Sequence, residues 1–124
     1  MYAFGGAKRE GNNIMQCRTI ERLAKGKAQW EVMNLQMPEP AMDQGCFELD
    51  NKIVVFGGFS QEEMSKKCWH LDVHKEAIEQ REGLERADFF QVNGVQVRAG
   101  AELWIAGHNN YHRFSGEGKF SLVI

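Results

Sequence analysis

The stretch Ile53-Val54-Val55-Phe56-Gly57-Gly58 decides how this chain folds. Four consecutive apolar residues, three of them β-branched, are typical of a short strand that is buried on both faces of its sheet. The two glycines that follow allow a sharp turn, a positive φ angle or the close approach of a neighbouring backbone. We therefore expect a central strand that ends in a tight glycine turn.

This pattern of an apolar run followed by glycine occurs three times along the chain. Phe4 lies 52 residues before Phe56, and Gly107 lies 50 residues after Gly57. A second spacing agrees, because the apolar residues of two later strands in each unit are 6 or 7 residues apart. These pairs are Leu23 and Trp30, Leu71 and Ile78, and Phe114 and Phe120. A period of this size indicates stacked supersecondary units, here of four short strands each.

The composition excludes several classes of protein. The chain has 124 residues and a formal net charge of −2, which gives no electrostatic footprint for nucleic acid. Its apolar runs are far shorter than the roughly 20 residues of a membrane span, and the N-terminus lacks the regions of a secretory signal. We therefore expect a cytoplasmic protein, with cytoskeletal association left open, that binds neither nucleic acid nor a membrane.

The cysteines and histidines do not predict a metal or disulfide site. Cys17, Cys46 and Cys68 are an odd set without a close pair, so we expect reduced thiols in apolar surroundings. Five other residues could contribute to a metal site: His70, Asp72, His74, His108 and His112. We favour instead a solvated outer face of one strand for the first three of these. We expect no metal and no cofactor.

Catalytic constellations are likewise not recognisable in the sequence. The acidic residues at 62–63, Glu82 and Glu85 lie in charged runs, which are more typical of solvated faces than of acid–base pairs. Neither a Ser-His-Asp arrangement nor a Cys-His arrangement is evident from order or spacing. The glycine pairs lack the lysine and helix start of a phosphate-binding loop. We expect no catalytic or cofactor-binding residue.

Taken together, these motifs resemble the kelch repeat. The residues that carry the resemblance are Gly5, Gly6, Trp30, Gly57, Gly58, Leu71, Asp72, Trp104 and Gly107. The resemblance covers nearly the whole chain as about two and three-quarter units. The sequence departs from the family pattern at Ile78, where tryptophan is expected, and at His108, which replaces the second glycine.

The resemblance implies an all-β fold in which each unit is one four-stranded, kelch-type blade of a β-propeller. We expect a partial blade at 1–36, which holds the second to fourth strands, and whole blades at 37–80 and 81–124, all within one propeller domain. A closed propeller typically uses 4–8 blades. The chain therefore predicts an incomplete ring, a partial β-propeller whose remaining blades come from a parent chain or from other chains.

The expected strands follow from this repeat. They are Tyr2–Gly5, Cys17–Leu23 and Trp30–Leu35; Gly45–Leu49, Ile53–Gly57, Lys67–Val73 and Glu76–Glu79; and Val95–Arg98, Leu103–Ala106, Asn110–Phe114 and Lys119–Val123. We align Val95–Arg98 with Cys46–Leu49 and expect a tight turn at 92–95. Helices stay open as alternatives at Gln61–Lys67 and Lys75–Glu85, and the composition of the second segment favours a helix.

Polar spacers of variable length follow the glycine pairs, and loops on a rigid scaffold usually carry binding. The candidate partner-binding residues are Arg9, Asn12, Phe59, Gln61, Glu62 and Asn109. Trp30 and Trp104 are instead expected to pack between units. The kelch resemblance implies a non-catalytic protein–protein interaction scaffold of the cytoskeletal, axonemal or ubiquitin-ligase adaptor type.

Two alternatives to the scaffold stay open. One is a small-molecule or sugar-acting propeller enzyme, which predicts convergent polar residues near Gly6, Gly58 and His108. The other is a structural subunit of a large assembly, in which the missing blades come from the same chain or adjacent chains.

Overall fold

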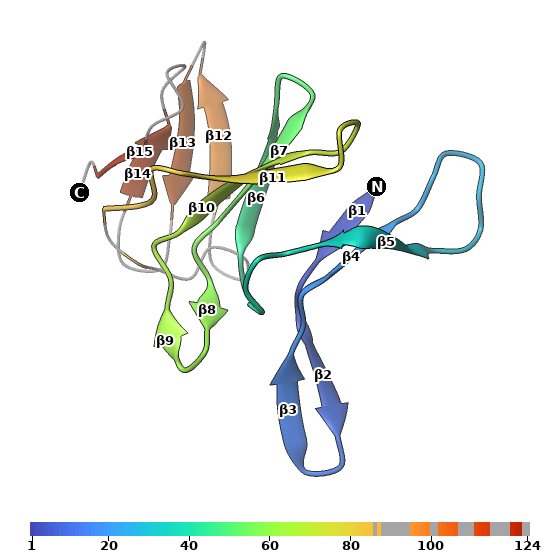
Figure 1. Cartoon of the computed structure of the whole chain (residues 1–124). Helices are drawn as coiled ribbons and strands as arrows, with labels where there is room; N and C mark the ends of the chain where they lie inside the picture. Colours follow the sequence, from blue (N-terminus) through green and yellow to red (C-terminus); the bar gives the residue numbers. More distant parts are fainter. Residues whose placement is uncertain (86, 88–94, 100–101, 107–110, 115–119, 123–124) are drawn as a thin grey trace.

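The chain folds into β-strands joined by turns (Figure 1). The computed structural model describes residues 1–85, 87, 95–99, 102–106, 111–114 and 120–122. Every regular element among these residues is a strand, so the predicted all-β class is confirmed. Accordingly, the described residues contain no helix with the length and apolar character that crossing a membrane requires.

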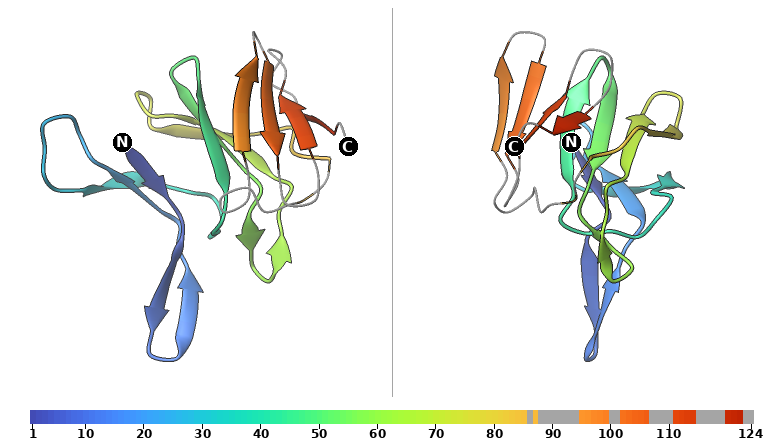
Figure 2. Two further views of the ribbon diagram at one scale, coloured as in Figure 1. Left: turned by 180° about the vertical axis from the view of Figure 1, so that it is seen from behind. Right: turned by 90° about the vertical axis from the view of Figure 1, so that its left-hand side faces the viewer.

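Three antiparallel sheets make up the body of the molecule. The first has the strand order β1-β4-β5, the second β11-β10-β7-β6 and the third β12-β13-β14-β15. Their strands are β1 (Tyr2–Phe4), β4 (Thr19–Arg22), β5 (Glu31–Gln36), β6 (Gly45–Leu49), β7 (Lys52–Phe56), β10 (Cys68–Asp72), β11 (Ala77–Arg81), β12 (Val95–Ala99), β13 (Glu102–Ala106), β14 (Tyr111–Phe114) and β15 (Phe120–Leu122). The sheets stand side by side in chain order (Figure 2).

Two further hairpins project from this body. One pairs β2 (Ala7–Glu10) with β3 (Asn13–Gln16), and the other pairs β8 (Phe59–Ser60) with β9 (Glu63–Met64). The possible helix at Gln61–Lys67 is therefore wrong, because the second hairpin occupies that segment. The possible helix at Lys75–Glu85 is wrong as well, because β11 adds to β10 as the repeat predicted.

Strand pairing supports the predicted repeat. The residue before each glycine faces the start of the next strand of its sheet: Phe4 pairs with Ile20, Phe56 with Cys68 and Ala106 with Tyr111. On their other side, the same strands pair with the strand that precedes them in the chain. Gly45 pairs with Phe56, and Val95 pairs with Ala106. Because Phe56 and Ala106 are equivalent residues, Val95 corresponds to Gly45. The predicted alignment of Val95 with Cys46 is wrong by one residue. Such a shift exchanges the two faces of a strand.

The glycine pairs leave space for the backbone of the segment that links the first sheet to the second. Gly5 and Gly58 have φ angles of +59° and +83°, and a Cβ atom on either would lie 2.5 Å from a carbonyl oxygen of that linker. The carbonyls belong to Ala41 and Met42, respectively. Only glycine accommodates both the backbone conformation and this close approach. Gly107 lies outside the described residues.

The central strands of the second sheet, β7 and β10, are buried on both faces. One apolar cluster joins it to the third sheet and includes Phe47, Val54, Phe56, Cys68, Leu103, Ile105, Phe114 and Phe120. The other joins it to the first sheet and includes Ile20, Met33, Met37, Val55, Trp69 and Leu71. Neighbours along β7 thus alternate between clusters, as the side-chain alternation of a strand requires. Each large apolar side chain buried here contributes roughly 1.5–3 kcal/mol of transfer free energy.

Candidate protein-interaction surface

Hairpins β2–β3 and β8–β9 extend from the same end of the molecule (Figure 1). Each hairpin follows a glycine pair and returns to its sheet through the carbonyl of the second glycine. The Cys17 amide donates to Gly6 at 2.8 Å, and the Ser65 amide donates to Gly58 at 2.8 Å. Two successive units therefore present equivalent hairpins on one side.

The linker between the first and second sheets holds the bases of both hairpins. The Gly6 amide donates to the Ala41 carbonyl at 2.8 Å. Met42 and Phe59 exchange amide-to-carbonyl hydrogen bonds of 3.0 and 2.8 Å, and the Ser60 hydroxyl donates to the Pro40 carbonyl at 2.6 Å. One short segment thereby fixes both hairpins to the apolar body.

A direct contact also joins the two hairpins. The Gln61 amide donates to Oε1 of Gln16 at 2.9 Å. Arg9 pairs with Ile14 two positions along the ladder from the pair of Ala7 with Gln16, so Arg9 and Ile14 share a face of the hairpin with Gln16. This shared face is the one whose Gln16 side chain reaches the second hairpin.

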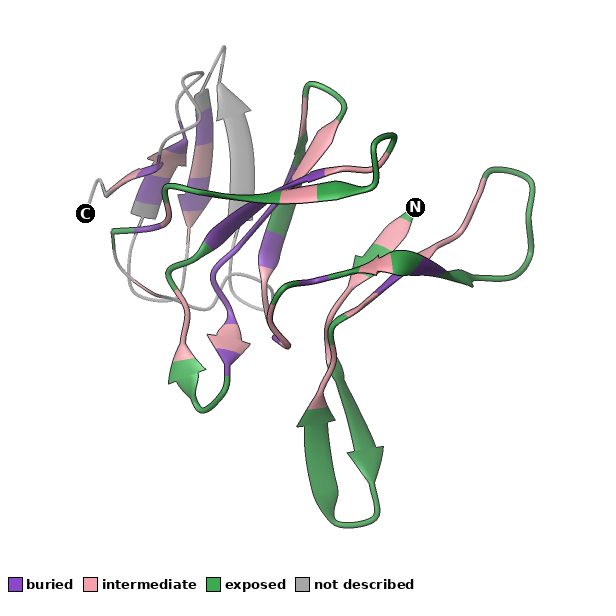
Figure 3. Ribbon diagram, in the orientation of Figure 1, coloured by how far each residue is buried: buried purple, intermediate pink, exposed green. Residues whose placement is uncertain are grey.

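The first hairpin is almost entirely exposed (Figure 3). Ile14 is 72% and Met15 45% exposed, so each face of the hairpin carries one exposed apolar side chain. Charged groups surround it: Lys8 pairs with Glu10 at 3.1 Å, and the Arg9 Nε donates to the Gly11 carbonyl at 3.1 Å. Apolar side chains framed by charges are typical of surfaces that bind other proteins.

The turn of the second hairpin is strained. Gln61 and Glu62 have φ angles of 51° and 71°, so both lie in the left-handed region. A two-residue turn of this kind favours Asn-Gly or Asp-Gly, and larger side chains there raise its energy. The comparable turn at Asp50 and Asn51 uses the residue types that tolerate this conformation. Retained strain in an exposed turn is a feature of functional segments.

Most of the predicted binding residues lie in these two hairpins. Arg9, Asn12, Gln61 and Glu62 are exposed on them, whereas Phe59 is half-buried where β8 meets the linker. Asn109 lies outside the described residues. Ile14, Met15 and Gln16 lie in the spacer 8–16 that was predicted to carry binding, but they were not among the individual residues predicted, although an Ile-Met pair inside a polar spacer was a usable signal.

The predicted tryptophan positions behave differently from one another. Trp30, expected to pack between units, is 44% exposed, so that expectation is wrong for this structure. Trp104 is half-buried, and the guanidinium carbon of Arg113 lies 6.0 Å from its ring centre. Trp69 is buried in the cluster between the first and second sheets. Among the described residues, no sheet packs on the outer face of the first sheet. Trp30 is exposed because nothing covers it there.

The pair Leu71-Asp72 has a structural explanation. Leu71 is fully buried, and Oδ1 of Asp72 accepts hydrogen bonds from the amides of His74 and Lys75, both at 3.1 Å. Both hydrogen bonds lower the pKa of Asp72, and the bond from the Lys75 amide has the larger effect. The pair therefore anchors the end of β10 and caps the turn into β11.

The histidines of this segment do not share a solvated face. His70 is buried and its ring centre lies 6.4 Å from that of Phe114, so the predicted outer-face position is wrong. His74 lies beyond the strand in the exposed turn. His108 lies outside the described residues. Among the residues that the structure describes, no group of three or more His, Cys, Asp or Glu side chains is arranged to hold a metal ion.

Two of the cysteines also depart from expectation. Cys68 is buried as predicted, and desolvation raises the pKa of its thiol to about 12. Cys46 is exposed and Cys17 is only partly buried, so the prediction of apolar surroundings for all three is wrong.

A cavity of about 430 Å³ adjoins the second hairpin. Its lining includes Gln61, Met64 and Leu84, and an ion pair between Lys67 and Glu39 lies at its edge. Charged groups of both signs and apolar side chains line it together, which suits a contact with another protein surface.

Comparison with known proteins shows a similar arrangement of strands in one solved structure and no family. No protein-family model matches the sequence, and no curated protein matches it. A solved structure described as "Structure of YjhT" superposes with a TM-score of 0.83 at 11% sequence identity, over 99% of this chain and 48% of that one. The chain thus spans about half the length of that protein. At this identity the likeness concerns the arrangement of strands alone.

Proposed function

We propose that this chain is a segment of a kelch-type β-propeller and serves as a non-catalytic scaffold for protein–protein interaction in the cytoplasm. Hairpins β2–β3 and β8–β9 form the proposed contact surface. The observation that carries the proposal is the hydrogen bond from the Gln61 amide to Gln16, which couples equivalent hairpins of two successive units.

The arrangement favours binding for a physical reason. The bases of both hairpins are hydrogen-bonded to one linker, which lies between two sheets that share an apolar cluster, so the exposed side chains are presented by a packed body. Pre-organised binding elements lose less conformational entropy on association. Ile14 offers an apolar contact on the face that it shares with Gln16, while Arg9 and Glu62 offer charges of opposite sign at its margin. The partner is therefore expected to be a protein with a small apolar patch in a polar rim.

The remainder of the ring is part of the same proposal. Three sheets in series leave the outer face of the first sheet and its β1 edge uncovered among the described residues. Further blades, from a longer parent chain or from other chains, would cover these surfaces.

Affinity capture with matched variants tests the function. The test variant combines Arg9→Ala, Ile14→Ser and Glu62→Ala, all at exposed positions of the two hairpins. The control combines Lys25→Ala with Lys75→Ala, which lie in exposed turns away from the hairpins (Figure 1). Quantitative mass spectrometry should show a protein that is retained by the wild type and the control and reduced at least about tenfold by the test variant. Equal capture by all three forms would contradict the proposal.

A further inference from the structure

His70 is a buried histidine between the second and third sheets. Its side chain is 7% exposed, and its ring centre lies 6.4 Å from that of Phe114 in the third sheet. Cys68, two residues earlier on the same strand face, belongs to the apolar cluster that joins the two sheets. The Nε2 atom of His70 has no hydrogen-bond partner among the residues that the structure describes. A buried polar atom of this kind calls for a physical explanation.

The repeat relates His70 to a basic residue in each of the other two sheets. The residue before each glycine pairs with one residue of the next strand, and two positions after that partner stand Arg22, His70 and Arg113. The residues opposite the first two also correspond, because Arg22 pairs with Glu31 and His70 pairs with Glu79. Of the three basic side chains, histidine is the one whose charge changes near neutral pH.

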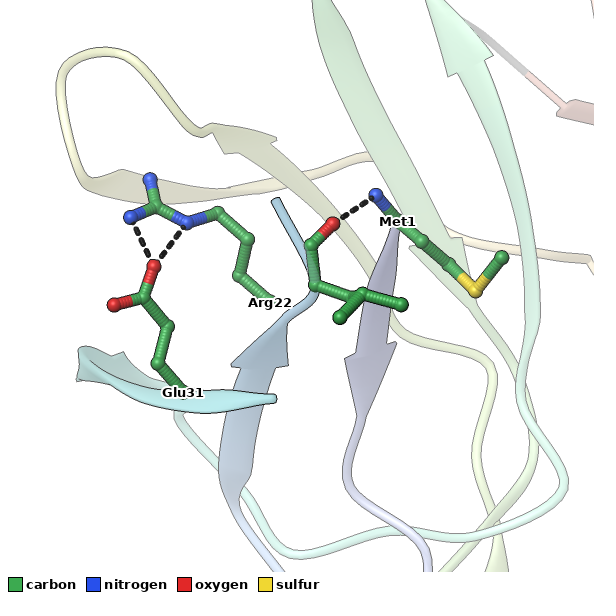
Figure 4. Close-up of polar contacts among 4 residues, drawn as sticks. Met1, Arg22 and Glu31 are labelled. Atoms are coloured by element: carbon green, nitrogen blue, oxygen red, sulfur yellow. Dashed lines mark hydrogen bonds and ion pairs between the residues drawn. The ribbon is translucent and has the colours of Figure 1, made fainter. Parts of the chain in front are cut away.

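The first sheet shows the contact that this register allows. The Arg22 Nε donates to Oε1 of Glu31 at 2.8 Å, and its Nη2 contacts the same oxygen (Figure 4). Directly opposite residues of neighbouring strands have Cβ atoms about 4.5–5.5 Å apart. A charged His70 is therefore within reach of Glu79, as Arg22 is of Glu31.

Glu79 has another partner in this structure. Its Oε2 lies 3.3 Å from Nε of Arg81, and both side chains are exposed. Exposed ion pairs contribute little to stability, so Glu79 can change partner at low cost. Glu79 and Arg81 are two residues apart on β11, and both lie on the same face of the second sheet as His70.

Glu79 is the one acidic side chain that faces His70 from a neighbouring strand among the described residues. The titratable groups on the two facing sheet surfaces are Lys52 on β7, Cys68 and Asp72 on β10, Glu79 and Arg81 on β11, and His112 on β14. Strands β6 and β13 contribute apolar side chains, and those of β12 lie outside the described residues. Oδ1 of Asp72 already accepts two amide hydrogen bonds. Burial, followed by the charges of Arg81 and Lys52, lowers the pKa of His70, and Glu79 raises it.

We infer that His70 is a pH-sensitive switch between the second and third sheets. The neutral ring fills the space beside Phe114 and keeps the two sheets together. A ring that has taken a proton from solvent leaves the apolar cluster, because an unpaired charge is costly to bury. It then pairs with Glu79 in place of Arg81, and the interface between the two sheets opens. The inference concerns two complete four-stranded sheets and stands whether or not the hairpins bind a partner.

Cys68 reports the opening in the unmodified chain. Its thiol is fully buried in the cluster between the two sheets, whereas Cys46 is exposed. A pyridyl disulfide reagent, which labels thiols at both acid and neutral pH, is added at pH 7.5 and at pH 5. The labelling rate of Cys68, divided by that of Cys46 in the same sample, should rise at least about fivefold at pH 5. An unchanged ratio would overturn the inference.

Hydrogen exchange distinguishes this local opening from unfolding of the whole chain. At pH 5 the amides of β4 and β5 in the first sheet should keep their protection, after correction for the intrinsic effect of pH on exchange. A loss of protection in β4 and β5 that accompanies the labelling of Cys68 would mean global unfolding and would also overturn the inference.

A variant without the imidazole tests the role of His70. In His70→Leu the labelling ratio should differ by less than about twofold between the two pH values. The control His74→Gln, in the exposed turn after β10, should keep the wild-type rise. A rise in His70→Leu that equals that of the wild type would assign the opening to another group and overturn the inference.

Removal of the proposed acidic partner tests the second state. In Glu79→Gln the midpoint of the His70 titration, followed by nuclear magnetic resonance, should lie about 0.5 pH or more below that of the wild type, because the charged ring loses its acceptor. The control Glu76→Gln, in the exposed turn before β11, should leave the midpoint unchanged. Equal midpoints in Glu79→Gln and the wild type would overturn the exchange of partners. Both positions are exposed, so this comparison decides even if His70→Leu does not fold.

Discussion

Oε1 of Gln16 accepts a hydrogen bond from the amide of Gln61, which lies 45 residues later in the sequence. Gln16 ends the first hairpin and Gln61 begins the turn of the second, so one contact joins the base of one hairpin to the tip of the next. Neither residue belongs to an apolar cluster. The contact therefore sets the relative position of two exposed hairpins and adds little to the core.

Gln16→Ala should loosen the hairpins without unfolding the chain. The lost bond is exposed, so the free energy of unfolding is expected to fall by only about 0.5 kcal/mol, near the lower limit for a hydrogen bond. Hydrogen exchange at the Gln61 amide should nevertheless become several-fold faster. Asn13→Ala, at the exposed tip of the same hairpin, is the control and should leave that exchange rate unchanged. Unaltered exchange in Gln16→Ala would show that the bond is not maintained in solution.

Replacing Gln61-Glu62 by Asn-Gly should stabilise the chain by about 1 kcal/mol, because Asn and Gly accept positive φ angles with less strain. Urea denaturation measures the gain. If the strained turn is kept for its side chains, the same variant should lose partner capture. A variant that is more stable and binds equally well would remove these two side chains from the contact surface.

Asn51→Gly is the matched control for this turn. Asn51 also has a positive φ angle, of 63°, but it is already a residue type that tolerates the conformation. The expected gain is therefore only a few tenths of a kcal/mol. A gain as large as that of the Asn-Gly variant would show that strain is not specific to the Gln61-Glu62 turn.

Gly58→Ala should destabilise the chain by about 3 kcal/mol or more, because a left-handed φ angle and a carbonyl 2.5 Å from the new Cβ atom both oppose it. Gly26→Ala is the control. Gly26 has a φ angle of +78°, but no atom lies within 4 Å of the Cβ position. Its cost should be the conformational one alone, about 1–2 kcal/mol. Equal losses in the two variants would mean that the linker does not approach Gly58 as closely as described.

Stability should fall as the pH is lowered below about 6.5, the ordinary pKa of histidine. Burial foremost, and then the positive charges of Arg81 and Lys52, lower the pKa of His70 in the folded chain, while Glu79 opposes them weakly. A histidine whose folded pKa is depressed contributes its full stability above the unfolded pKa. That contribution is lost as the pH falls toward the folded pKa.

His70→Leu should reduce this pH dependence, which urea denaturation at pH 5 and pH 7.5 would reveal. His74→Gln, in the exposed turn that follows β10, should retain the wild-type difference between the two pH values. Should His70→Leu and the wild type lose stability in parallel on acidification, another group is responsible.

The repeat and the strands were predictable because each unit carries strong local signals. Ile53–Phe56 followed by two glycines leaves few alternatives to a buried strand and a tight turn. The one-residue error at β12 has a clear origin. Residue type favours Cys46 over Gly45 as the counterpart of Val95, and only the pairing of Val95 with Ala106 shows that its counterpart is Gly45.

Burial of individual side chains was less predictable than the strands. Alternation along β10 tells which residues share a face, but both faces of this central strand are covered, so His70 becomes buried together with its neighbours. Trp30 shows the opposite case, because it was expected to be buried between units and is exposed. An aromatic residue at a repeat position is buried only if another layer covers its sheet, and the local sequence of the repeat contains no information on that layer.

The two hairpins could be predicted only in part from the sequence. A polar spacer such as Ala7–Gln16 predicts exposure and variability, and it does not by itself predict a β-hairpin. The contact of Gln16 with Gln61 depends on the spacing of two sheets and has no sequence signal at all. Candidate residues could therefore be assigned to the spacers, while their joint surface required the structure.

Hydrogen exchange of the chain with and without its captured partner tests the central claim most directly. We predict slower exchange in both hairpins, at residues 7–16 and 59–65, and no change at the turns 24–28 and 73–76. Protection confined to those turns, with both hairpins exchanging as in the unbound chain, would contradict the claim that coupled hairpins of successive units form one protein-binding surface.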